Sequence, residues 1–375
     1  MERNNGLNRT QYKVMNFVFY QNILSIHQSA FIRHLAEKHQ VTLVVEEALN
    51  KEREKDGWIN PDFGNTEIII KPTSSEIDRL ISFKDALHIF SGINSFPLST
   101  QIFNLAVNKK LKIGVILEPF NWMGVSGKLR FIKYFILRLK YNRKLQFILA
   151  IGDRGRWCYE KVGFFKNKIF DWAYFTESVE CEVQHKPVDD LPSLLFVGSI
   201  SKRKNIIPFV REVKYIKQYF KELNIIGIGD LADELLLEIR EEPQIKYLGG
   251  ISNSKIPQCV GNSDLLILPS LFDGWGAVVN EALMCGVPAF ASDHCGASVL
   301  LKGIRGCVYS VKKKDLCEQL INFSKELPYT DEKKKDIRDW AVNNISGKAA
   351  ADYFESIIKC ENDKRLKPTA PWLND

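Results

Sequence analysis

Two acidic residues separated by seven positions, Asp273 and Glu281, lie in a glycine-rich stretch with the makings of a ligand site. The run from Asn262 to Gly296 is typical of a buried strand, a loop and a helix. Gly274 and Gly276 let the loop backbone approach a ligand, and amides at the start of a helix attract phosphate. Both carboxylates can accept hydrogen bonds from sugar hydroxyls. We therefore expect a site for a ligand with phosphate and sugar groups, the alternative being a plain turn with Glu281 in solvent.

A second candidate site follows the apolar run Leu195–Val197, which ends at Gly198. The residues after this glycine include Arg203 and Lys204. Cations in such a turn could bind the phosphate groups of that ligand. A solvated basic turn is an equally good interpretation of these residues in isolation. Their position after a buried strand and a glycine favours the functional interpretation.

The elements that must position these residues alternate along the whole chain. Short apolar or β-branched runs, typical of buried strands, are separated by longer helical stretches. In the first half they are Val14–Phe19, Val41–Val45, Glu67–Ile70, Leu87–Phe90, Lys112–Ile116, Gln146–Ile151 and Trp172–Phe175. After a polar linker, Thr176–Pro192, they are Leu194–Val197, Asn224–Ile228, Ile245–Leu248, Asp264–Leu268, Pro288–Ala291 and Cys307–Tyr309. We expect an α/β protein with two doubly wound, Rossmann-like domains that face each other across a ligand cleft.

At the segment around Asp273 and Glu281 the chain resembles glycosyltransferase family 4, retaining enzymes of the GT-B fold found in bacterial polysaccharide biosynthesis. The family's signature is two acids with seven residues between them, followed by Gly-x-Pro, here Gly286-Val287-Pro288. The resemblance implies that Glu281 binds the nucleotide ribose. It also implies that Asp273, as a catalytic residue, and the loop hold the donor sugar and diphosphate. The loop residues concerned are Gly274, Trp275, Gly276, Ala277 and Val278. The first acid is usually Glu in the family, so Asp273 is a shortened version.

The resemblance extends to the turn after Gly198. The family commonly has Arg directly after this glycine and Lys five positions later, both of which reach the donor phosphates. Lys204 matches the Lys, whereas Ser199 stands in place of the Arg, and Arg203 is the substitute cation nearby. We expect Lys204 and Arg203 to act in catalysis and Ser199 to lie in the donor site. In relatives the backbone near the Gly-Gly pair before Ile251 contacts the nucleobase, which adds Ile251 to this site unless the pair is simply a turn.

The N-terminal half resembles the family mainly in its architecture. Relatives often have a histidine at the position of Phe90, and we expect His88 to point to the opposite face of that strand. Glu118, at the end of the next strand, is then the nearest polar candidate in the pocket, though not as a nucleophile. His27 and Gln28 are expected at a helix N-terminus that faces the cleft. In enzymes of this kind the departing phosphate is thought to help deprotonate the acceptor, so no protein base is required.

The expected domains are an acceptor-binding domain (residues 1–180), a nucleotide-sugar-binding domain (190–345) and a C-terminal helix that crosses back, with an extended tail (346–375). The resemblance implies transfer of a sugar from a nucleotide sugar, a UDP- or GDP-sugar, to a glycan or lipid-linked glycan with retention of configuration. Two alternatives stay open, the second of them because Phe90 and Ser199 depart from the family pattern. One is an epimerase or phosphorylase of the same fold. The other is a non-catalytic nucleotide-binding partner subunit.

Positive charge is concentrated in one part of the chain. Residues 119–170 contain 12 Lys and Arg against 2 Asp and Glu, whereas the remainder contains 40 and 43. Within them Lys128–Lys144 mixes cations with large apolar residues, a composition that can dock on an anionic membrane surface. An ordinary helix with its apolar side packed inward is an equally good interpretation. The apolar residues are mostly not exposed stacking aromatics, which disfavours nucleic-acid binding.

Length and cysteine usage bound the remaining possibilities. A chain of 375 residues is long enough for two hydrophobic cores. No run of about 20 apolar residues is present, and Met1–Thr10 lacks the apolar core of a signal peptide. Eight cysteines without a CxxC pair favour a reducing cytoplasm. The dispersed histidines predict no metal site, and we expect no cofactor besides the nucleotide sugar. These features predict a cytoplasmic protein, peripheral on the inner face of the cell membrane if the basic helix docks there.

Overall fold

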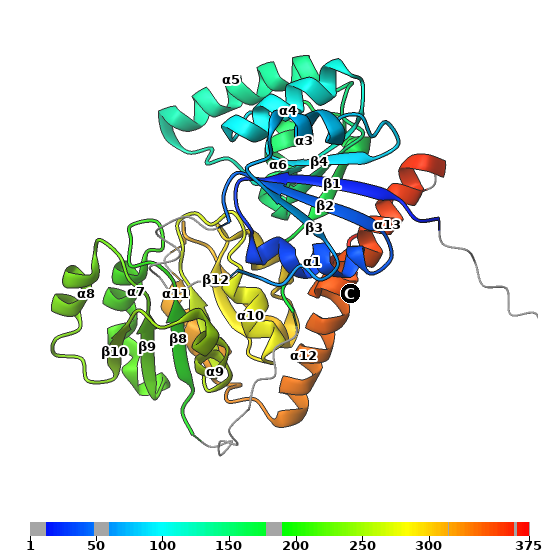
Figure 1. Cartoon of the computed structure of the whole chain (residues 1–375). Helices are drawn as coiled ribbons and strands as arrows, with labels where there is room; N and C mark the ends of the chain where they lie inside the picture. Colours follow the sequence, from blue (N-terminus) through cyan, green and yellow to red (C-terminus); the bar gives the residue numbers. More distant parts are fainter. Residues whose placement is uncertain (1–12, 49–59, 178–189, 314, 364–365, 375) are drawn as a thin grey trace, which may run out of the picture.

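Two parallel β-sheets organise the chain, one in each half (Figure 1). The structure, a computed structural model, describes residues 13–48, 60–177, 190–313, 315–363 and 366–374. The segment Met1–Thr10 and most of the expected linker lie outside these residues. Strands and helices alternate through most of the described residues of both halves, so the predicted pair of doubly wound α/β domains is confirmed.

The N-terminal sheet has seven parallel strands in the order β3-β2-β1-β4-β5-β6-β7. Its strands are β1 (Asn16–Gln21), β2 (Gln40–Val45), β3 (Glu67–Ile70), β4 (Leu87–Ser91), β5 (Lys112–Leu117), β6 (Phe147–Ile151) and β7 (Ile169–Trp172). Its helices are α1 (Ile26–Ala36), α3 (Ser74–Leu80), α4 (Pro97–Asn108), α5 (Gly124–Tyr141) and α6 (Gly152–Lys161). The winding direction reverses between β1 and β4, which opens a crevice at the carboxyl ends of these strands.

The C-terminal sheet has six parallel strands in the order β10-β9-β8-β11-β12-β13, and its winding reverses between β8 and β11. Its strands are β8 (Ser193–Val197), β9 (Glu222–Ile226), β10 (Ile245–Gly249), β11 (Leu265–Leu268), β12 (Ala289–Ser292) and β13 (Gly306–Tyr309). Its helices are α7 (Ile206–Val213), α8 (Ala232–Glu238), α9 (Ile256–Gly261), α10 (Val278–Met284), α11 (Leu316–Ser324) and α12 (Asp331–Ile345). The two reversal points face each other across the space between the sheets (Figure 1).

Every strand predicted from the sequence is present, with ends that move by at most three residues. The largest shift is at β7, which ends at Trp172 although a strand was predicted over Trp172–Phe175. Tyr174 and Phe175 leave the sheet because they bond elsewhere. The Phe175 amide donates to the His27 carbonyl (3.3 Å), and the Asn280 side-chain amide donates to the Tyr174 carbonyl (2.8 Å). The segment after β7 therefore connects helix α1 to helix α10.

The last long helix, α13 (Gly347–Asp363), packs on the N-terminal half beside α1 (Figure 1). The buried Phe354 ring contacts Phe17 and Phe31 edge-on, at centroid distances of 5.5 and 5.3 Å. The ammonium group of Lys38 lies 2.9 Å from a carboxylate oxygen of Asp352. Apolar packing and a surface ion pair thus connect the end of the chain to its beginning.

The expectation of an extended, loosely held tail is wrong for its final turn. Residues Pro371–Leu373 form a short 3-10 helix, and Trp372 is 1% exposed. Its indole packs against Phe175 and Tyr353, at centroid distances of 5.6 Å from each. Burial of so large an apolar side chain outweighs the tendency of the two nearby prolines to keep the tail extended.

Helix α5 exposes a row of large apolar side chains. Its inner face is buried at Leu137 and Tyr141, and the Tyr141 ring packs edge-on against Phe103 of α4, with centroids 5.0 Å apart. Each member of the opposite row is more than half exposed: Val125, Leu129, Ile132, Ile136 and Leu139. The interpretation of this segment as an ordinary helix with its apolar side inward accounts for the buried face and the exposed lysines but not for this row, because the helix is apolar on both faces. Within the described part of the chain, no helix is both long enough and apolar enough to cross a bilayer.

Candidate active site

The two candidate motifs of the C-terminal half meet at the carboxyl ends of neighbouring strands. Lys204 follows β8 and Asp273 follows β11, and these strands pair directly. The Lys204 ammonium group donates to Oδ2 of Asp273 at 2.6 Å, and each side chain is only 12% exposed. Arg203 lies 3.6 Å from the same oxygen and is half exposed. The structure thus brings Arg203, Lys204 and Asp273 together, as the sequence predicted.

Backbone contacts hold the loop that follows Asp273. The Asp273 amide donates to the His294 carbonyl (3.1 Å), and the Gly296 amide donates to the Asp273 carbonyl (3.2 Å). Gly276 has a φ of +95°, a conformation that side chains disfavour. A Cβ atom there would lie 2.7 Å from Cys295 Sγ. Glycine is therefore required at Gly276, as expected for a loop whose backbone must follow a set path.

Glu281 lies in the first turn of α10, a seven-residue helix preceded by Ala277. The helix ends where predicted, before Gly286, whose φ of +75° stops it. Glu281 is half-buried as a residue, and no side-chain hydrogen bond to its carboxyl occurs among the described residues. Burial raises its pKa to about 7. Hydroxyl groups of a ligand would supply the donors that this carboxylate lacks in the protein.

The remaining predicted residues of the donor side occupy different places. Trp275 is buried, and its indole N–H donates to the Asn280 side chain at 2.7 Å, so it supports the loop from within. Ser199 is exposed in the turn after β8, with its hydroxyl 3.1 Å from that of Ser201. Ile251 follows β10, which lies two strands away from β8 in the sheet. It shares the edge of the sheet with the motif residues and stands apart from the Lys204 turn.

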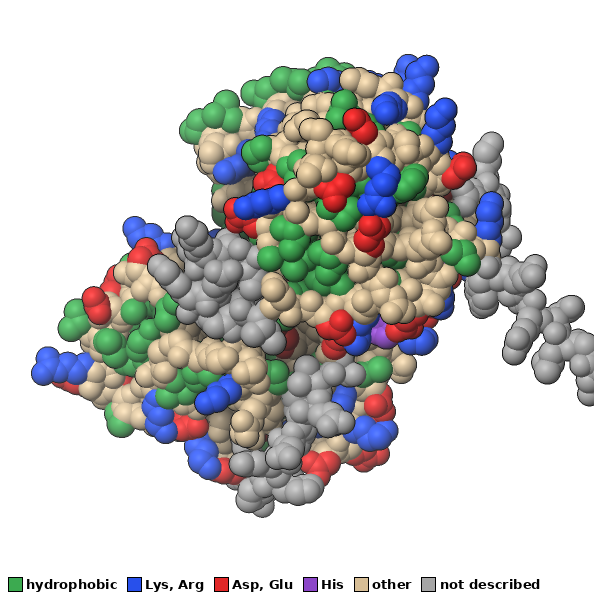
Figure 2. Space-filling view, in the orientation of Figure 1, with side chains coloured by type: hydrophobic (Ala, Val, Ile, Leu, Met, Phe, Trp, Pro, Cys, Tyr) green, Lys and Arg blue, Asp and Glu red, His purple; other side chains and the backbone are tan. Residues whose placement is uncertain are grey.

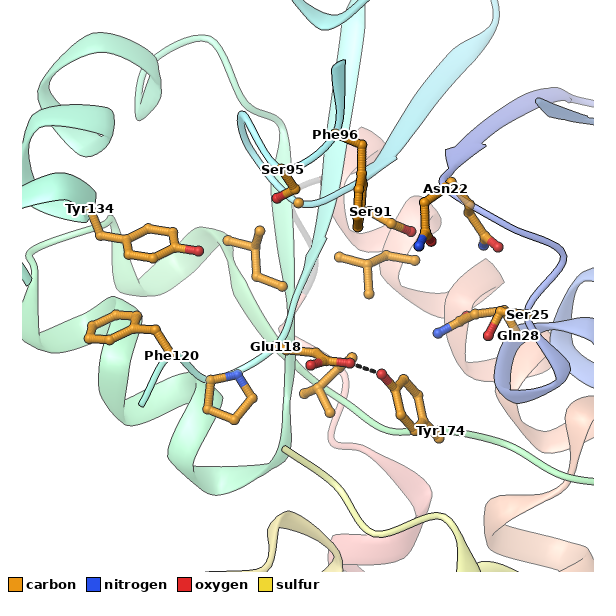
Figure 3. Close-up of a pocket in the computed structure, with 16 residues that line it drawn as sticks. Asn22, Ser25, Gln28, Ser91, Ser95, Phe96, Glu118, Phe120, Tyr134 and Tyr174 are labelled. Carbon is orange, nitrogen blue, oxygen red and sulfur yellow. Dashed lines mark hydrogen bonds between the residues drawn. The ribbon is translucent and has the colours of Figure 1, made fainter. Parts of the chain in front are cut away.

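A pocket of about 280 Å³ lies at the crevice between β1 and β4 in the N-terminal half (Figure 3). Gln21 is the last residue of β1, Ser91 is the last of β4, and Glu118 directly follows β5. Of the side chains expected to face the cleft, Gln28 lines the pocket, whereas His27 stacks on Tyr174 at 4.8 Å. The other residues that line it are Asn22, Ser25, Gly92, Ser95, Phe96, Ile116, Leu117, Pro119, Phe120, Tyr134, Ile151 and Tyr174.

Glu118 joins this pocket to the loop of residues 273–278, which we call the donor loop after the role that the sequence predicts for it. One of its carboxylate oxygens accepts a hydrogen bond from the Tyr174 hydroxyl (Figure 3). The other, Oε2, lies 3.2 Å from the position that a Cβ atom on Gly274 would take. Glu118 is exposed toward the cleft. Desolvation by the protein around it raises the pKa of its carboxyl, the Asp273 charge raises this pKa further, and Arg203 partly offsets the increase. A carboxylate is thus placed between the two halves.

The expected orientation of His88 is wrong. Residues two apart in a strand project from the same face, and both His88 and Phe90 contact Tyr20. The Phe90 ring stacks on Tyr20 at 4.4 Å, and the His88 ring shares a 3.0 Å hydrogen bond with the Tyr20 hydroxyl. Both residues are fully buried, and neither lines the pocket. The position at which relatives often have a histidine is therefore part of the core.

Contacts between the two halves hold the pocket opposite the donor loop. Arg154 donates to the Asp293 carbonyl at 3.0 Å and lies over the Trp122 ring. Trp122 also contacts Phe272 edge-on, with centroids 5.6 Å apart. Phe272 is the residue before Asp273, so these contacts fix the entrance to the donor loop against the N-terminal half.

Sequence reasoning missed Tyr174, Gln21 and Ser91. A signal for two of them was available, because Gln21 and Ser91 end predicted parallel strands, and ligands bind at the carboxyl ends of such strands. Tyr174 had no such signal, since the sequence placed it inside a strand. Among the described residues, no group of three His, Cys, Asp or Glu side chains is arranged to hold a metal ion.

Comparisons with known proteins show which families and folds the chain resembles. A protein of the cps region of Klebsiella pneumoniae is 24% identical over 290 residues, which are 73% of this chain and 78% of that protein. The N,N'-diacetylbacillosaminyl-diphospho-undecaprenol alpha-1,3-N-acetylgalactosaminyltransferase of Campylobacter jejuni is 24% identical over 234 residues, 61% of this chain and 58% of the enzyme. The structure of HepE from Anabaena with UDP and glucose superimposes with a TM-score of 0.66 at 13% identity, covering 92% of this chain and 99% of HepE.

The structural likeness extends over nearly the whole of both chains, and it shows the fold. The model of the family described as glycosyl transferases group 1 matches residues 180–343. These residues contain both donor-side motifs, with the Lys204 turn and the loop after Asp273. The protein therefore has the two-domain GT-B fold, and its C-terminal half matches the glycosyl transferases group 1 family.

Proposed function

We propose that the protein is a glycosyltransferase that moves a sugar from a nucleotide-sugar donor to an acceptor hydroxyl. The observation that carries the proposal is the 2.6 Å contact between Lys204 and Asp273. This contact lies at the carboxyl ends of two neighbouring strands. It pairs a cation that can bind a diphosphate with a carboxylate that can accept a hydrogen bond from a sugar hydroxyl. In a GT-B protein the donor must lie in this cleft, where charge that develops on the leaving group can be stabilised by fixed cations.

The donor is a UDP-sugar in this proposal. Glu281 binds the ribose hydroxyls, and Lys204 with Arg203 binds the diphosphate. The loop Gly274–Val278 contributes backbone amides, and Asp273 accepts a hydrogen bond from a hydroxyl of the transferred sugar. The structure of HepE with UDP supports the choice of uracil as the base, since the two proteins share a fold.

The acceptor is a glycan or lipid-linked glycan, and the transfer retains the anomeric configuration. The printed name of the Campylobacter relative, whose acceptor is linked to diphospho-undecaprenol, supports a lipid-linked acceptor. The spacing of Asp273 and Glu281 supports retention, because the retaining family that the sequence resembles has the same spacing. In the pocket, Tyr134 comes from α5, whose outer face carries the exposed apolar row.

Helix α5 docks on an anionic bilayer surface in this proposal. The row Val125, Leu129, Ile132, Ile136 and Leu139 is visible along the top of the molecule, with Lys and Arg beside it (Figure 2). No acidic residue lies between Pro119 and Asp153, so nothing in this stretch would repel anionic lipids. A helix with an exposed apolar row and flanking cations has the composition of interfacial helices. Docking would bring a lipid-linked acceptor close to the pocket.

The transfer reaction is tested by incubating the protein with UDP-glucose, UDP-galactose, UDP-N-acetylglucosamine and GDP-mannose, with and without candidate acceptors. Release of the nucleotide with one donor, and NMR detection of a product that keeps the donor's anomeric configuration, would support the proposal. Interconversion of free nucleotide sugars without an acceptor would identify an epimerase instead. Tight nucleotide binding without turnover on any acceptor would favour the partner subunit.

Membrane docking is tested by sedimentation with liposomes that contain phosphatidylglycerol or only phosphatidylcholine. We expect the wild-type protein to sediment with the anionic liposomes at low salt and a Leu129→Ser/Ile136→Ser variant to stay in solution. A matched control is Leu236→Ser/Leu237→Ser, which removes two exposed leucines from α8. Equal sedimentation of both variants, or none of the wild-type protein, would contradict docking through α5.

A further inference from the structure

The pocket between β1 and β4 contains buried polar groups that no other described residue satisfies. Gln21 is 4% exposed, and both polar atoms of its side-chain amide lack a hydrogen-bond partner. Gln28 is 5% exposed, and its amide oxygen also lacks one. Both residues line the pocket. Because buried polar groups in folded proteins are nearly always hydrogen-bonded, these amides indicate a ligand that can donate and accept hydrogen bonds.

The other lining residues restrict the chemistry of that ligand. Of the sixteen residues that line the pocket, Glu118 alone is charged, and none is a Lys, Arg or His. A phosphate or a uronic acid would bring a second negative charge close to this carboxylate, with no lining cation to compensate it. Serine hydroxyls and the aromatic rings of Phe96, Tyr134 and Tyr174 complete the wall. Hydroxyls and amides for polar groups, with rings for an apolar face, fit an uncharged sugar ring.

The carboxylate of Glu118 is placed for a reaction at one end of this ring. Its Oε1 is held by the Tyr174 hydroxyl, and the Tyr174 ring is in turn stacked on His27. Its Oε2 faces Gly274, the residue after Asp273 in the donor loop. A sugar hydroxyl that donates to this carboxylate would therefore lie between the pocket and the bound donor sugar.

We propose that this pocket binds an uncharged sugar ring of the acceptor and that Glu118 takes the proton of the attacking hydroxyl. The inference rests on the proposed glycosyl transfer. The acceptor oxygen forms a bond to the anomeric carbon of the donor, and the bond from that carbon to the diphosphate oxygen breaks. The electron pair of the broken bond leaves with the nucleoside diphosphate, and the hydroxyl proton goes to the Glu118 carboxylate. Solvent removes this proton after the product departs.

The raised pKa of Glu118 is consistent with this role, since a carboxylate with a higher pKa is a stronger base. The alternative is that the departing phosphate takes the proton and Glu118 only orients the hydroxyl. The two assignments differ in their dependence on pH. Proton transfer to Glu118 requires its ionised form, so the rate at saturating donor must fall as the pH drops below the pKa of Glu118, and this fall must disappear when the residue cannot titrate.

Binding to the pocket can be measured without a donor. Saturation-transfer NMR on the full chain would use methyl α-glucoside and methyl β-galactoside as neutral probes and glucuronate as the anionic one. We expect a neutral glycoside to bind and glucuronate not to bind. Gln21→Leu should weaken neutral-sugar binding by about tenfold without lowering the melting temperature, because it replaces an unpaired amide with an apolar group of similar size. Gln101→Leu, at an exposed position on α4, is the control and should bind as the wild type does.

Proton transfer is tested by the release of UDP from UDP-glucose in the presence of a neutral glycoside that binds. Glu118→Gln should lower the acceptor-dependent rate by about 100-fold and abolish the fall in rate at low pH. UDP affinity should stay unchanged, and Glu118→Asp should recover part of the rate together with the pH dependence. A Glu118→Gln variant that keeps the wild-type rate and pH profile would overturn the assignment of the base.

The outcomes separate this inference from the proposed function. If the wild-type protein binds no nucleotide and releases none, the glycosyltransferase proposal fails, yet the NMR experiment still decides whether the pocket takes a sugar. If nucleotide binds but neither neutral glycoside does, or if glucuronate binds better, the pocket assignment is overturned while the donor site stands. Wild-type sugar binding by Gln21→Leu would likewise overturn it.

Discussion

The Lys204 ammonium group and the Asp273 carboxylate form a 2.6 Å ion pair between two loops that are 69 residues apart in the sequence. Both side chains are mostly buried, so the pair is little screened by water. Arg203 adds a second, more exposed cation at 3.6 Å. An anionic ligand that enters this site would meet two cations held in place by one carboxylate, an arrangement that stabilises charge without having to reorganise.

Replacing Lys204 should therefore affect turnover more than binding. We expect Lys204→Met to lower kcat by about 100-fold or more, while the affinity for UDP falls only several-fold, because charge on the leaving group grows in the transition state. Steady-state kinetics and nucleotide titration measure the two effects. Arg203→Met, which removes the more exposed cation, is the matched comparison and should cost less. Equal losses of binding and turnover in Lys204→Met would indicate a simple binding role.

The titration of Glu281 predicts two opposite pH dependences. Its pKa is raised from 4.5 to about 7 in the folded protein, so its contribution to stability is present below pH 4.5 and is lost as the pH rises through about 7. Glu281→Gln does not titrate, so its free energy of unfolding relative to the wild type should increase over this range. Nucleotide affinity should behave in the opposite way. Ribose hydroxyls donate to the ionised carboxylate, so the wild type should bind UDP more tightly as the pH rises through about 7.

The Gln variant also provides the control for the measurement of nucleotide affinity. Any pH dependence that comes from the titration of UDP itself is the same for both proteins. Chemical denaturation and calorimetry at several pH values give the two curves. A difference in the free energy of unfolding that stays constant with pH would show that the Glu281 carboxyl is not buried enough to raise its pKa.

Gly276→Ala should destabilise the donor loop. Its Cβ would lie 2.7 Å from both Cys295 Sγ and Leu268 Cδ2, and the φ of +95° is unfavourable for alanine. We expect a loss of about 1–3 kcal/mol in the free energy of unfolding, together with weaker nucleotide binding. Gly303→Ala is the control, since Gly303 also has a positive φ but has open space around it. It should lose only the backbone cost of about 1 kcal/mol and bind nucleotide normally.

Trp372 tests whether the end of the chain is structural. Trp372→Ala removes a side chain that packs on Phe175 and Tyr353, so we expect a loss of about 3–5 kcal/mol in the free energy of unfolding. Leu366→Ala, at a residue that is 97% exposed, should change it by less than about 0.5 kcal/mol. Denaturant titration measures both. Similar, small changes for the two variants would mean that the tail contributes little.

The sequence predicted the sheets because their strands are continuous apolar runs, the pattern that burial on both faces requires. The pairing of Lys204 with Asp273 was not predicted, although it follows from the doubly wound fold, since the reversal of winding brings the ends of β8 and β11 together. The carboxyl ends of β1 and β4 meet for the same reason, so Gln21 and Ser91 could have been predicted as residues of the pocket.

Other features depend on packing that no local pattern contains. The contact between Glu118 and Tyr174 requires the segment after β7 to leave the sheet. The apolar run Trp172–Phe175 instead predicts that the strand continues. The orientation of α5 could not be predicted, because a helix with large apolar residues on both faces has no unique inner side. The burial of Trp372 depends on a surface built by residues far away in the sequence, Phe175 and Tyr353.

The most direct test of the account is calorimetric titration of the wild-type protein and Glu281→Ala with UDP, GDP, ADP and CMP. The account predicts that the wild type binds UDP and that Glu281→Ala weakens this binding by about 1–3 kcal/mol, because ribose hydroxyls lose their buried partner. Such a result would support a nucleotide-sugar site with Glu281 at the ribose. A well-folded wild-type protein that binds none of the four nucleotides would contradict the proposed function, and an unchanged affinity in Glu281→Ala would remove Glu281 from the ribose.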